Sequence, residues 1–262
     1  MIDETSIREF GDELYTALVN QKMVEPLTDR MPDITLEDAY HISLRILEKR
    51  LSSGEKLTGK KIGITSDVVK EMFGVNQPDF GFLTDAMGCE NGAEVTINGR
   101  LIQPRAEGEI AFILRTDLIG PGITEAQVLD ATDYIMPCFE VVDSRVKNWQ
   151  IKIQDTIADN ASCGIYVLGD AKVDPRTLDL PKLGMKVFKN GKLLSEGVGE
   201  AVQGNPLSAV AWLANTLSQF GIPLKAGEVI LSGSLVPPES VAPGDKMHLE
   251  LDGVGSATVK FI

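Results

Sequence analysis

The order of two hydrophobic patterns along the chain is the feature that most limits its fold. Over residues 1–55 apolar residues recur at helical spacing, and one stripe comprises Ile7, Phe10, Leu14 and Leu18. Later segments show short apolar runs, or the strict alternation of Met247–Leu251, which is typical of strands. Because the two kinds of segment do not alternate as β-α-β units, the sequence predicts an α+β fold rather than a doubly wound sheet.

Polar capping residues and glycines mark the ends of the expected helices. Thr35 is an N-cap candidate for a second helix, and Gly54 is its expected stop. Capping patterns also predict helices over residues 66–74, 124–132 and 205–221. The apolar face of the second helix is expected to comprise Leu36, Tyr40, Leu44, Leu47 and Leu51.

Strands are expected at Ile110–Leu114 and Tyr134–Val142, which are apolar runs. The dipeptide Asn190-Gly191 separates two further short segments and is a strong signal for a type I′ hairpin. These patterns predict an N-terminal helical segment over residues 1–57 and a catalytic β-rich domain over 58–262, with both integrated into one domain.

Charge and cysteine content restrict the partners and the compartment. The formal net charge of −13 disfavours nucleic acid and anionic membranes as partners, but a local cation would still allow a small anionic substrate. The N-terminus has no apolar core of a signal peptide, and no apolar run is long enough to span a membrane. Three widely spaced cysteines, Cys89, Cys138 and Cys163, favour a reducing cytoplasm over a disulfide framework.

Two glutamates in the segment Pro104–Ile110 are candidates for a metal site. Glu107 and Glu109 are two positions apart and lead into an expected strand, so an extended chain would direct both to one face. Two carboxylates about 4 Å apart repel by roughly 4 kcal/mol at an effective dielectric near 20, and a hard divalent cation would relieve this. Oxygen ligands favour Mg²⁺ or Mn²⁺ over zinc. Spacing alone nevertheless favours a solvated strand face.

A third carboxylate, Glu140, lies within an apolar stretch and therefore needs a specific partner. A salt bridge to Arg145 is as simple an explanation as a metal site. Only two histidines are present, His41 and His248, and they are expected to be surface or hydrogen-bonded positions. A Ser-His-Asp triad is therefore disfavoured, and no dinucleotide or Walker A fingerprint is present.

Further polar residues lie in glycine-containing loops. Lys61 and Asp79 each sit close to glycines and could form an acid–base pair, although ordinary surface turns explain both loops. Ser162 belongs to a polar run that also suits a helix cap or turn. Ser232 and Gly233 could present backbone N–H groups to a carboxylate, or could form a hairpin turn.

These residues belong to a series of segments that spans the chain from about Ile7 to Ile262. The segments are GKKIGIT at 59–65, NQPDFGFLTDAM at 76–87, PRAEGEIAF at 104–112, PCFEVVDSR at 137–145, DTIADNASCG at 155–164, GEVILSGSL at 227–235 and GVGSATVKFI at 253–262. Together they resemble the fumarylacetoacetate hydrolase superfamily, specifically its hydratase and decarboxylase branch. Ordered motifs over such a length are far more specific than any one of them.

The resemblance implies roles for the acidic and basic candidates. Glu107, Glu109 and Glu140 would be the metal ligands, which reverses the expectation from spacing alone. Lys61 and Asp79 would form the acid–base pair beside the substrate. The implied cofactor is Mg²⁺ or Mn²⁺.

The resemblance also implies a substrate site, a fold and an assembly. Ser162 and the turn formed by Ser232 and Gly233 would help to hold a substrate carboxylate. The implied fold is a mixed β-sandwich roll with helices around it, and the implied assembly is a homo-oligomer. Hydratases of this branch associate with 4-oxalocrotonate decarboxylase, so that enzyme is an expected partner.

The implied reaction is metal-dependent addition of water to 2-hydroxypenta-2,4-dienoate (2-oxopent-4-enoate), which gives 4-hydroxy-2-oxopentanoate in aromatic meta-cleavage catabolism. One alternative is 4-oxalocrotonate decarboxylation, but members of that branch tend to lack the P-D-[FY]-G sequence found at Pro78–Gly81. Hydratases of longer 2-oxo-enedioates carry similar loops, so the substrate's length stays open.

Two other classes of function fit the sequence less well. Carbon–carbon hydrolysis in the superfamily uses a His–Glu dyad, and this chain has no histidine between His41 and His248. A catalytically silent partner of a decarboxylase is the alternative outside enzymes. Intact candidates at every metal and acid–base position argue against silence.

Overall fold

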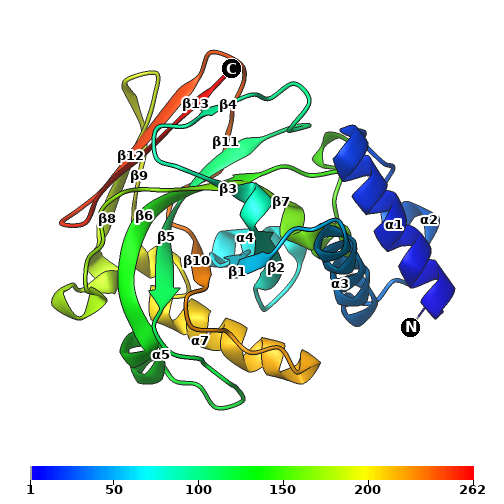
Figure 1. Ribbon diagram of the computed structural model, residues 1–262, viewed down its shortest axis with the longest axis horizontal. Coiled ribbons are helices and arrows are strands. Elements are labelled where there is room, and N and C mark those ends of the chain that lie inside the picture. The colour runs from blue at the N-terminus through cyan, green and yellow to red at the C-terminus, as the bar shows by residue number, and fades with distance from the viewer. Residues whose placement is uncertain (1) are drawn as a thin grey trace.

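The computed structural model describes residues 2–262 and has an α+β fold, as predicted (Figure 1). The helices are α1 (Glu4–Asn20), α2 (Leu27–Arg30), α3 (Leu36–Ser52), α4 (Asp67–Phe73), α5 (Glu125–Ala131), α6 (Ile153–Ala158) and α7 (Pro206–Leu217). The strands are β1 (Leu57–Gly63), β2 (Asp79–Thr84), β3 (Gly88–Cys89), β4 (Glu94–Val95), β5 (Arg105–Leu114), β6 (Thr132–Val142), β7 (Cys163–Leu168), β8 (Gly184–Lys189), β9 (Lys192–Val198), β10 (Val229–Ser234), β11 (Glu239–Ser240), β12 (Lys246–Leu251) and β13 (Gly255–Phe261). None of these helices combines the length and apolar character that crossing a membrane requires.

Local capping chemistry sets several helix starts where the sequence predicts them. Thr35 and Thr124 each accept a hydrogen bond from the backbone N–H three residues on and complete a capping box. Asn205 caps α7, with Pro206 in the first turn. Asn190 and Gly191 both have positive φ, as a type I′ hairpin between β8 and β9 requires.

Helix α3 buries a wider face than the predicted one, in which Tyr40 is buried and Leu36, Leu44 and Leu47 pack partly buried against the core. Its fully buried apolar residues include Ala39, Ile42 and Ile46, whereas Leu51 is 40% exposed. The reason is that α3 packs against α1 on one side and α6 on another, so no single stripe is the contact face. The predicted leucine stripe therefore describes only part of the buried surface.

The strands form two sheets. The larger sheet has the order β2-β1-β10-β5-β6-β7-β3, with β11 added beside β5, and the smaller has the order β4-β13-β12-β8-β9. The larger sheet is curled. Three strands separate β1 from β7 in the strand order, yet the Tyr166 hydroxyl on β7 lies 3.2 Å from the Thr58 hydroxyl on β1. A small apolar cluster, which includes Cys138, Cys163 and Leu231, packs within this curl.

The two sides of β5 face different surroundings. A Cβ on Gly108 would lie 2.5 Å from Met185 Sδ on β8, so the glycine permits close packing of β5 on the smaller sheet. Glu107 and Glu109 alternate with Gly108 and project to the opposite side. The strand is longer than predicted and begins at Arg105, so both glutamates lie within it rather than before it.

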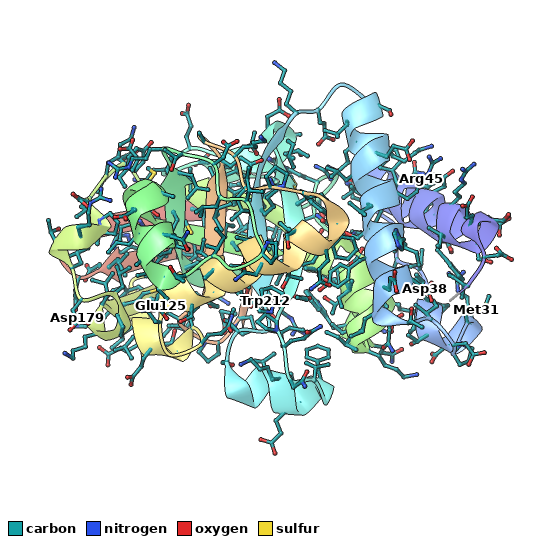
Figure 2. The ribbon with its side chains drawn as sticks, turned by 90° about the horizontal axis from the view of Figure 1, so that it is seen from below. Met31, Asp38, Arg45, Glu125, Asp179 and Trp212 are labelled. Carbon is teal, nitrogen blue, oxygen red and sulfur yellow. The ribbon has the colours of Figure 1, made fainter. Side chains whose placement is uncertain are left out.

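Helices cover the ends and the outside of the sheets. Figure 2 shows α7, marked by Trp212, crossing the molecule, and α3, marked by Asp38 and Arg45, at one end beside α1. The short helix α4, in cyan, projects from the body of the molecule. The finer prediction of a β-sandwich roll and the division at residues 57 and 58 stay predictions.

Candidate metal centre and its cavity

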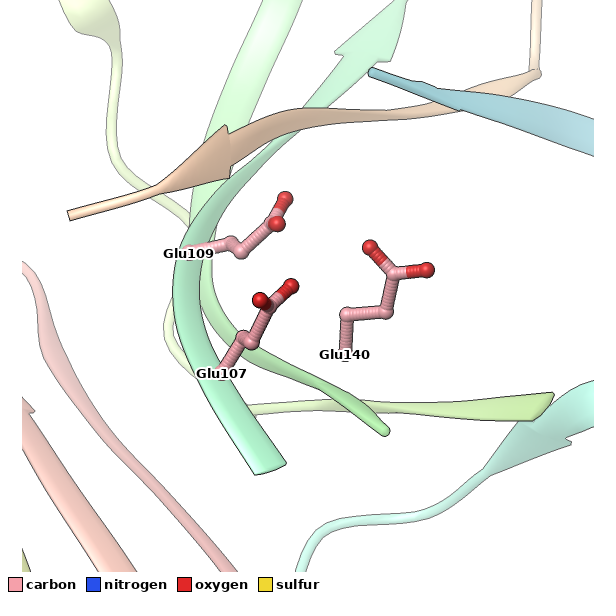
Figure 3. Close-up of side chains that lie close together, drawn as sticks. All are labelled: Glu107, Glu109 and Glu140. Carbon is pink, nitrogen blue, oxygen red and sulfur yellow. The ribbon is translucent and has the colours of Figure 1, made fainter. Parts of the chain in front are cut away.

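Three glutamates converge on one point inside the curled sheet. Glu107 and Glu109 come from β5 and Glu140 from the neighbouring β6, and their carboxylates point into one space (Figure 3). One oxygen from each lies within 4.8 Å of the others. Glu107 and Glu140 are direct cross-strand partners in the antiparallel pair, which explains how residues 33 positions apart in sequence meet.

The electrostatics of this cluster call for a cation. Burial, and next the charge of Glu140, raise the pKa of Glu107 to about 7 and that of Glu109 well above its usual range. Glu109 Oε1 and both carboxylate oxygens of Glu140 are buried and accept no hydrogen bond from the described residues, although the Lys61 ammonium lies 3.2 Å from Glu140 Oε1. Unsatisfied buried carboxylate oxygens are costly, and an all-oxygen set suits a hard divalent ion. The residues present therefore fit Mg²⁺ or Mn²⁺.

Lys61 and Asp79 lie beside the three glutamates on adjacent strands. Lys61 Nζ is 3.2 Å from Glu140 Oε1, and both Lys61 and Asp79 are buried. Burial alone would lower the pKa of Lys61, but the charges of Glu140 and Asp79 raise it above its usual value. Burial raises the pKa of Asp79 to about 6, although Lys61 opposes the shift. A Cβ on Gly63 would lie 2.3 Å from Asp79 Oδ1, so this glycine makes room for the carboxylate.

The neighbouring lysine faces the other way. Lys60 is buried, and its Nζ lies 2.5 Å from both carboxylate oxygens of Glu228. Alternation along β1 sends consecutive side chains to opposite faces, so only Lys61 reaches the glutamates. The Lys60–Glu228 pair holds β1 to the loop before β10.

Arg145 is not the partner of Glu140, which corrects the salt bridge that the sequence offered as an equally simple explanation. Its Nε donates to Asp159 Oδ1 at 2.5 Å, and its Nη1 donates to the carbonyl of Cys163 at 2.9 Å. Glu140 pairs with Lys61 instead. Arg145 thus braces the chain that leads to Ser162.

Ser162 ends a strained turn held against β2. Asn160, Ala161 and Ser162 all have left-handed φ, between 48° and 56°, which costs about 1–3 kcal/mol per residue. Asn160 offsets this cost, because its side chain accepts from Phe82 N at 2.8 Å and donates to Phe82 O at 3.0 Å. Gly81 allows the close approach, since a Cβ there would lie 2.5 Å from the carbonyl oxygen of Asn160.

The Ser232 and Gly233 turn contacts the cluster of three glutamates through Glu109. The Gly233 N–H donates to Glu109 Oε2 at 2.9 Å, and the Ser232 hydroxyl donates to the Gly233 carbonyl at 3.3 Å. Gly233 has a φ of 102°, which favours glycine. In this structure the turn orients Glu109, and its expected contact with a substrate carboxylate stays a proposal.

A cavity of about 210 Å³ opens beside the cluster. Its polar lining includes Lys61, Asp79, Arg105, Glu107 and Ser162, and α4 and the segment 149–151 contribute apolar walls. Among the described lining residues, neither Ser232 nor Gly233 appears. Sequence reasoning missed Arg105, although its spacing of two from Glu107 places it on the same face of β5.

Comparison with known proteins agrees with this architecture. Residues 67–262 match the family described as fumarylacetoacetate (FAA) hydrolase, C-terminal. The chain belongs to the fumarylacetoacetate hydrolase family. Within that family it is 55% identical over 262 residues to a 2-hydroxyhexa-2,4-dienoate hydratase of Comamonas testosteroni, covering 100% of this chain and 99% of that protein.

Two further proteins are similar to this chain in sequence or in structure. A 2-hydroxypent-2,4-dienoate hydratase of Pseudomonas putida is 62% identical over 221 residues, covering 84% of this chain and 100% of that protein. The solved 4-oxalocrotonate decarboxylase from Pseudomonas putida G7, complexed with magnesium and adipate, superposes with a TM-score of 0.97 at 34% identity. That match covers 100% of this chain and 99% of the decarboxylase.

Proposed function

We propose that this member of the fumarylacetoacetate hydrolase family is a hydro-lyase that adds water to 2-hydroxypenta-2,4-dienoate and forms 4-hydroxy-2-oxopentanoate. The observation that carries the proposal is the cluster of three glutamates, of which Glu109 and Glu140 are buried, beside a cavity that Glu107, Lys61 and Asp79 line. Relatives named as hydratases of such dienoates, at 55% and 62% identity, support it. The pathway would be aromatic meta-cleavage catabolism.

Glu107, Glu109 and Glu140 would hold the divalent cation, either Mg²⁺ or Mn²⁺. When bound, the cation supplies Lewis acidity to the carboxylate and the 2-oxygen of the substrate. Glu140 also contacts Lys61, so the cluster and the acid–base residues share one electrostatic environment. The magnesium named with the related decarboxylase supports a divalent ion.

Lys61 and Asp79 would divide the proton chemistry. Since its raised pKa keeps Lys61 protonated, this residue donates hydrogen bonds and stabilises negative charge on the substrate oxygen. Asp79, with a pKa of about 6, can change protonation state near neutral pH and so can accept and return a proton. The 2-hydroxyl loses a proton and C5 gains one. Water then adds hydroxyl at C4 and hydrogen at C3, and Ser162 would donate to the substrate carboxylate.

Two alternatives are weaker. The fold of 4-oxalocrotonate decarboxylase is nearly superimposable, but its 34% identity is lower than that of the two hydratases. A catalytically silent partner of that decarboxylase has no need for the buried acid–base pair. We also propose a cytoplasmic homo-oligomer that can associate with the decarboxylase, on the basis of the family resemblance and three free cysteines.

The test is product identification by NMR after purified protein meets freshly generated 2-hydroxypenta-2,4-dienoate. Magnesium should support formation of 4-hydroxy-2-oxopentanoate, and chelation should abolish it. Release of carbon dioxide from 4-oxalocrotonate, with no hydration of the dienoate, would identify a decarboxylase instead. No turnover of either compound, together with a stoichiometric complex with the decarboxylase, would indicate a silent partner.

Replacement of the proposed proton carrier tests the roles of the residues. Asp79→Asn should lower kcat by about 10²–10⁴-fold, the usual contribution of a general acid or base, while Mg²⁺ binding is retained. Steady-state kinetics and calorimetric Mg²⁺ titration separate the two effects. Near-full activity of Asp79→Asn would show that another group carries the proton.

A further inference from the structure

We propose that Arg105 binds the carboxylate of the substrate, and that the Trp149 indole holds its guanidinium in place for this task. The inference rests on the proposed hydratase function and deepens it, because it assigns a binding residue and restricts the substrate to monocarboxylic dienoates.

The Arg105 guanidinium is a positive charge without an acidic partner among the described side chains. Of the described residues that line the cavity, only Lys61 and Arg105 are cations. The ammonium of Lys61 is already balanced by Glu140 and Asp79. Among the side chains that the structure describes, none makes an ion pair or a hydrogen bond with the Arg105 guanidinium, whose neighbours are the Trp149 ring and the charge of Glu107.

Arg105 is also held in position. Its Cζ lies 4.4 Å from the centroid of the Trp149 ring, within the range of a cation–π contact. The indole is held in turn, because Trp149 Nε1 donates to the backbone carbonyl oxygen of Gln103 at 3.1 Å. Stacking occupies a face of the guanidinium, so its N–H edge stays available for the planar, two-bonded geometry that carboxylates accept.

The location of Arg105 matches the substrate that the metal cluster requires. Arg105 and Glu107 lie on one face of β5, two residues apart, so their Cα atoms are about 6.5–7 Å apart. A carboxylate held near Glu107 is therefore within reach of the long arginine side chain. With a net charge of −13, the protein also needs a local cation to attract an anion into an acidic cavity.

The residues that line the cavity also disfavour a substrate with a second carboxylate. The positive charge of Lys61 is balanced by Glu140 and Asp79, and Arg105 is engaged by the first carboxylate, so a second one would face apolar residues such as Val69, Phe73 and Ile151. Burying an unpaired carboxylate there is unfavourable. The cavity therefore suits a hydrocarbon far end, as in a pentadienoate or hexadienoate, rather than a diacid.

The experiment compares Arg105→Gln and Arg105→Met with wild type, and uses Arg100→Gln as a control because Arg100 is exposed and lies outside the cavity lining. With Mg²⁺ and 2-hydroxypenta-2,4-dienoate, both Arg105 variants should raise KM about 10- to 100-fold with little change in kcat, as expected when a charged hydrogen bond made equally in ground and transition states is lost. Trp149→Ala should raise KM less. Arg100→Gln should behave as wild type.

A binding measurement makes the result independent of turnover. In calorimetric titrations at saturating Mg²⁺, the Arg105 variants should bind pyruvate about 10- to 100-fold more weakly than wild type, while pyruvamide binding stays unchanged. Unchanged KM and unchanged pyruvate affinity in a folded, Mg²⁺-binding Arg105 variant would overturn the inference. So would a wild-type preference for a 2-oxo-enedioate that Arg105→Gln abolishes, since Arg105 would then bind the far end. Absence of any wild-type turnover would reject the proposed function, whereas the pyruvate titrations would still decide the role of Arg105.

Discussion

At the scale of single residues, two adjacent lysines have opposite tasks. Lys61 lines the cavity and contacts the buried Glu140, whereas Lys60 forms a buried pair with Glu228. Both lie in the segment GKKIGIT, whose composition does not distinguish them. The two side chains point to opposite faces of the sheet. Which of these faces is the cavity side depends on the pairing of β1 with β10 and β2, which are distant in the sequence.

This difference predicts separable effects of mutation. Lys60→Met should lower the free energy of unfolding by about 3–5 kcal/mol, because the buried Glu228 carboxylate loses its ion-pair partner and keeps only the N–H of Lys225 as a donor, yet kcat of the folded fraction should persist. Urea unfolding and active-site-normalised kinetics measure the two effects. The control is Lys60→Met combined with Glu228→Met, which should recover much of the stability. If Lys60→Met abolishes turnover in a stably folded protein, Lys60 belongs to the site after all.

Residue spacing predicts the positions of some candidate metal ligands but not of all three. The spacing of Glu107 and Glu109 predicts that both side chains lie on one face of a strand. Both residues lie in β5, two positions apart and therefore on the same face. Spacing could not bring Glu140 to them, because a cross-strand register is set by the whole β5–β6 pair. The resemblance supplied that link. Arg105 escaped notice because its lack of an acidic partner is visible only in three dimensions.

At the scale of elements, local chemistry was predictable and long-range packing was not. Caps such as Thr35 and Thr124 act within one turn, so sequence alone locates the starts of α3 and α5. The buried face of α3 depends on α1 and α6, which no local pattern reveals. The left-handed turn that presents Ser162 was also hidden, because its support comes from Phe82, 78 residues away from Asn160.

That turn leads to a prediction about Asn160. Asn160→Ala removes both hydrogen bonds to Phe82 and leaves a strained φ, so it should cost about 2–4 kcal/mol of stability and raise KM by displacing Ser162. Asn160→Gly also removes the bonds but tolerates the φ of 56°. Thermal unfolding should therefore rank wild type, then glycine, then alanine. Equal stability of the three proteins would contradict the assigned role of the side chain.

At the scale of the whole molecule, folding, protons and the cation are linked. The folded-state pKa of Glu107 is raised to about 7 from an ordinary 4.5, so between these values the metal-free folded protein binds more protons than the unfolded chain. This group's effect on metal-free stability therefore becomes less favourable as pH rises through that window. A bound cation needs the carboxylates ionised, so its affinity should increase as pH rises towards and past 7.

Thermal unfolding with and without Mg²⁺ at pH 6 and pH 8 checks this linkage. The increase in Tm on adding Mg²⁺ should be larger at pH 8, and calorimetry in buffers of different ionisation enthalpy should detect proton release at pH 6. Glu107→Gln should reduce both the proton release and the dependence of Mg²⁺ affinity on pH. A Mg²⁺ effect on Tm that is the same at both pH values would refute the raised pKa.

The direct pairing of Glu107 with Glu140 has a consequence for how the chain reaches its native state. A slip of β6 by one residue against β5 would turn Glu140 to the other side of the sheet and dismantle the ion site. Only molecules with the native register of β5 and β6 could then bind the ion, so ion binding would selectively stabilise correctly folded molecules. During refolding, ion uptake should accordingly lag behind the formation of strand structure, and chelated protein should accumulate misaligned species.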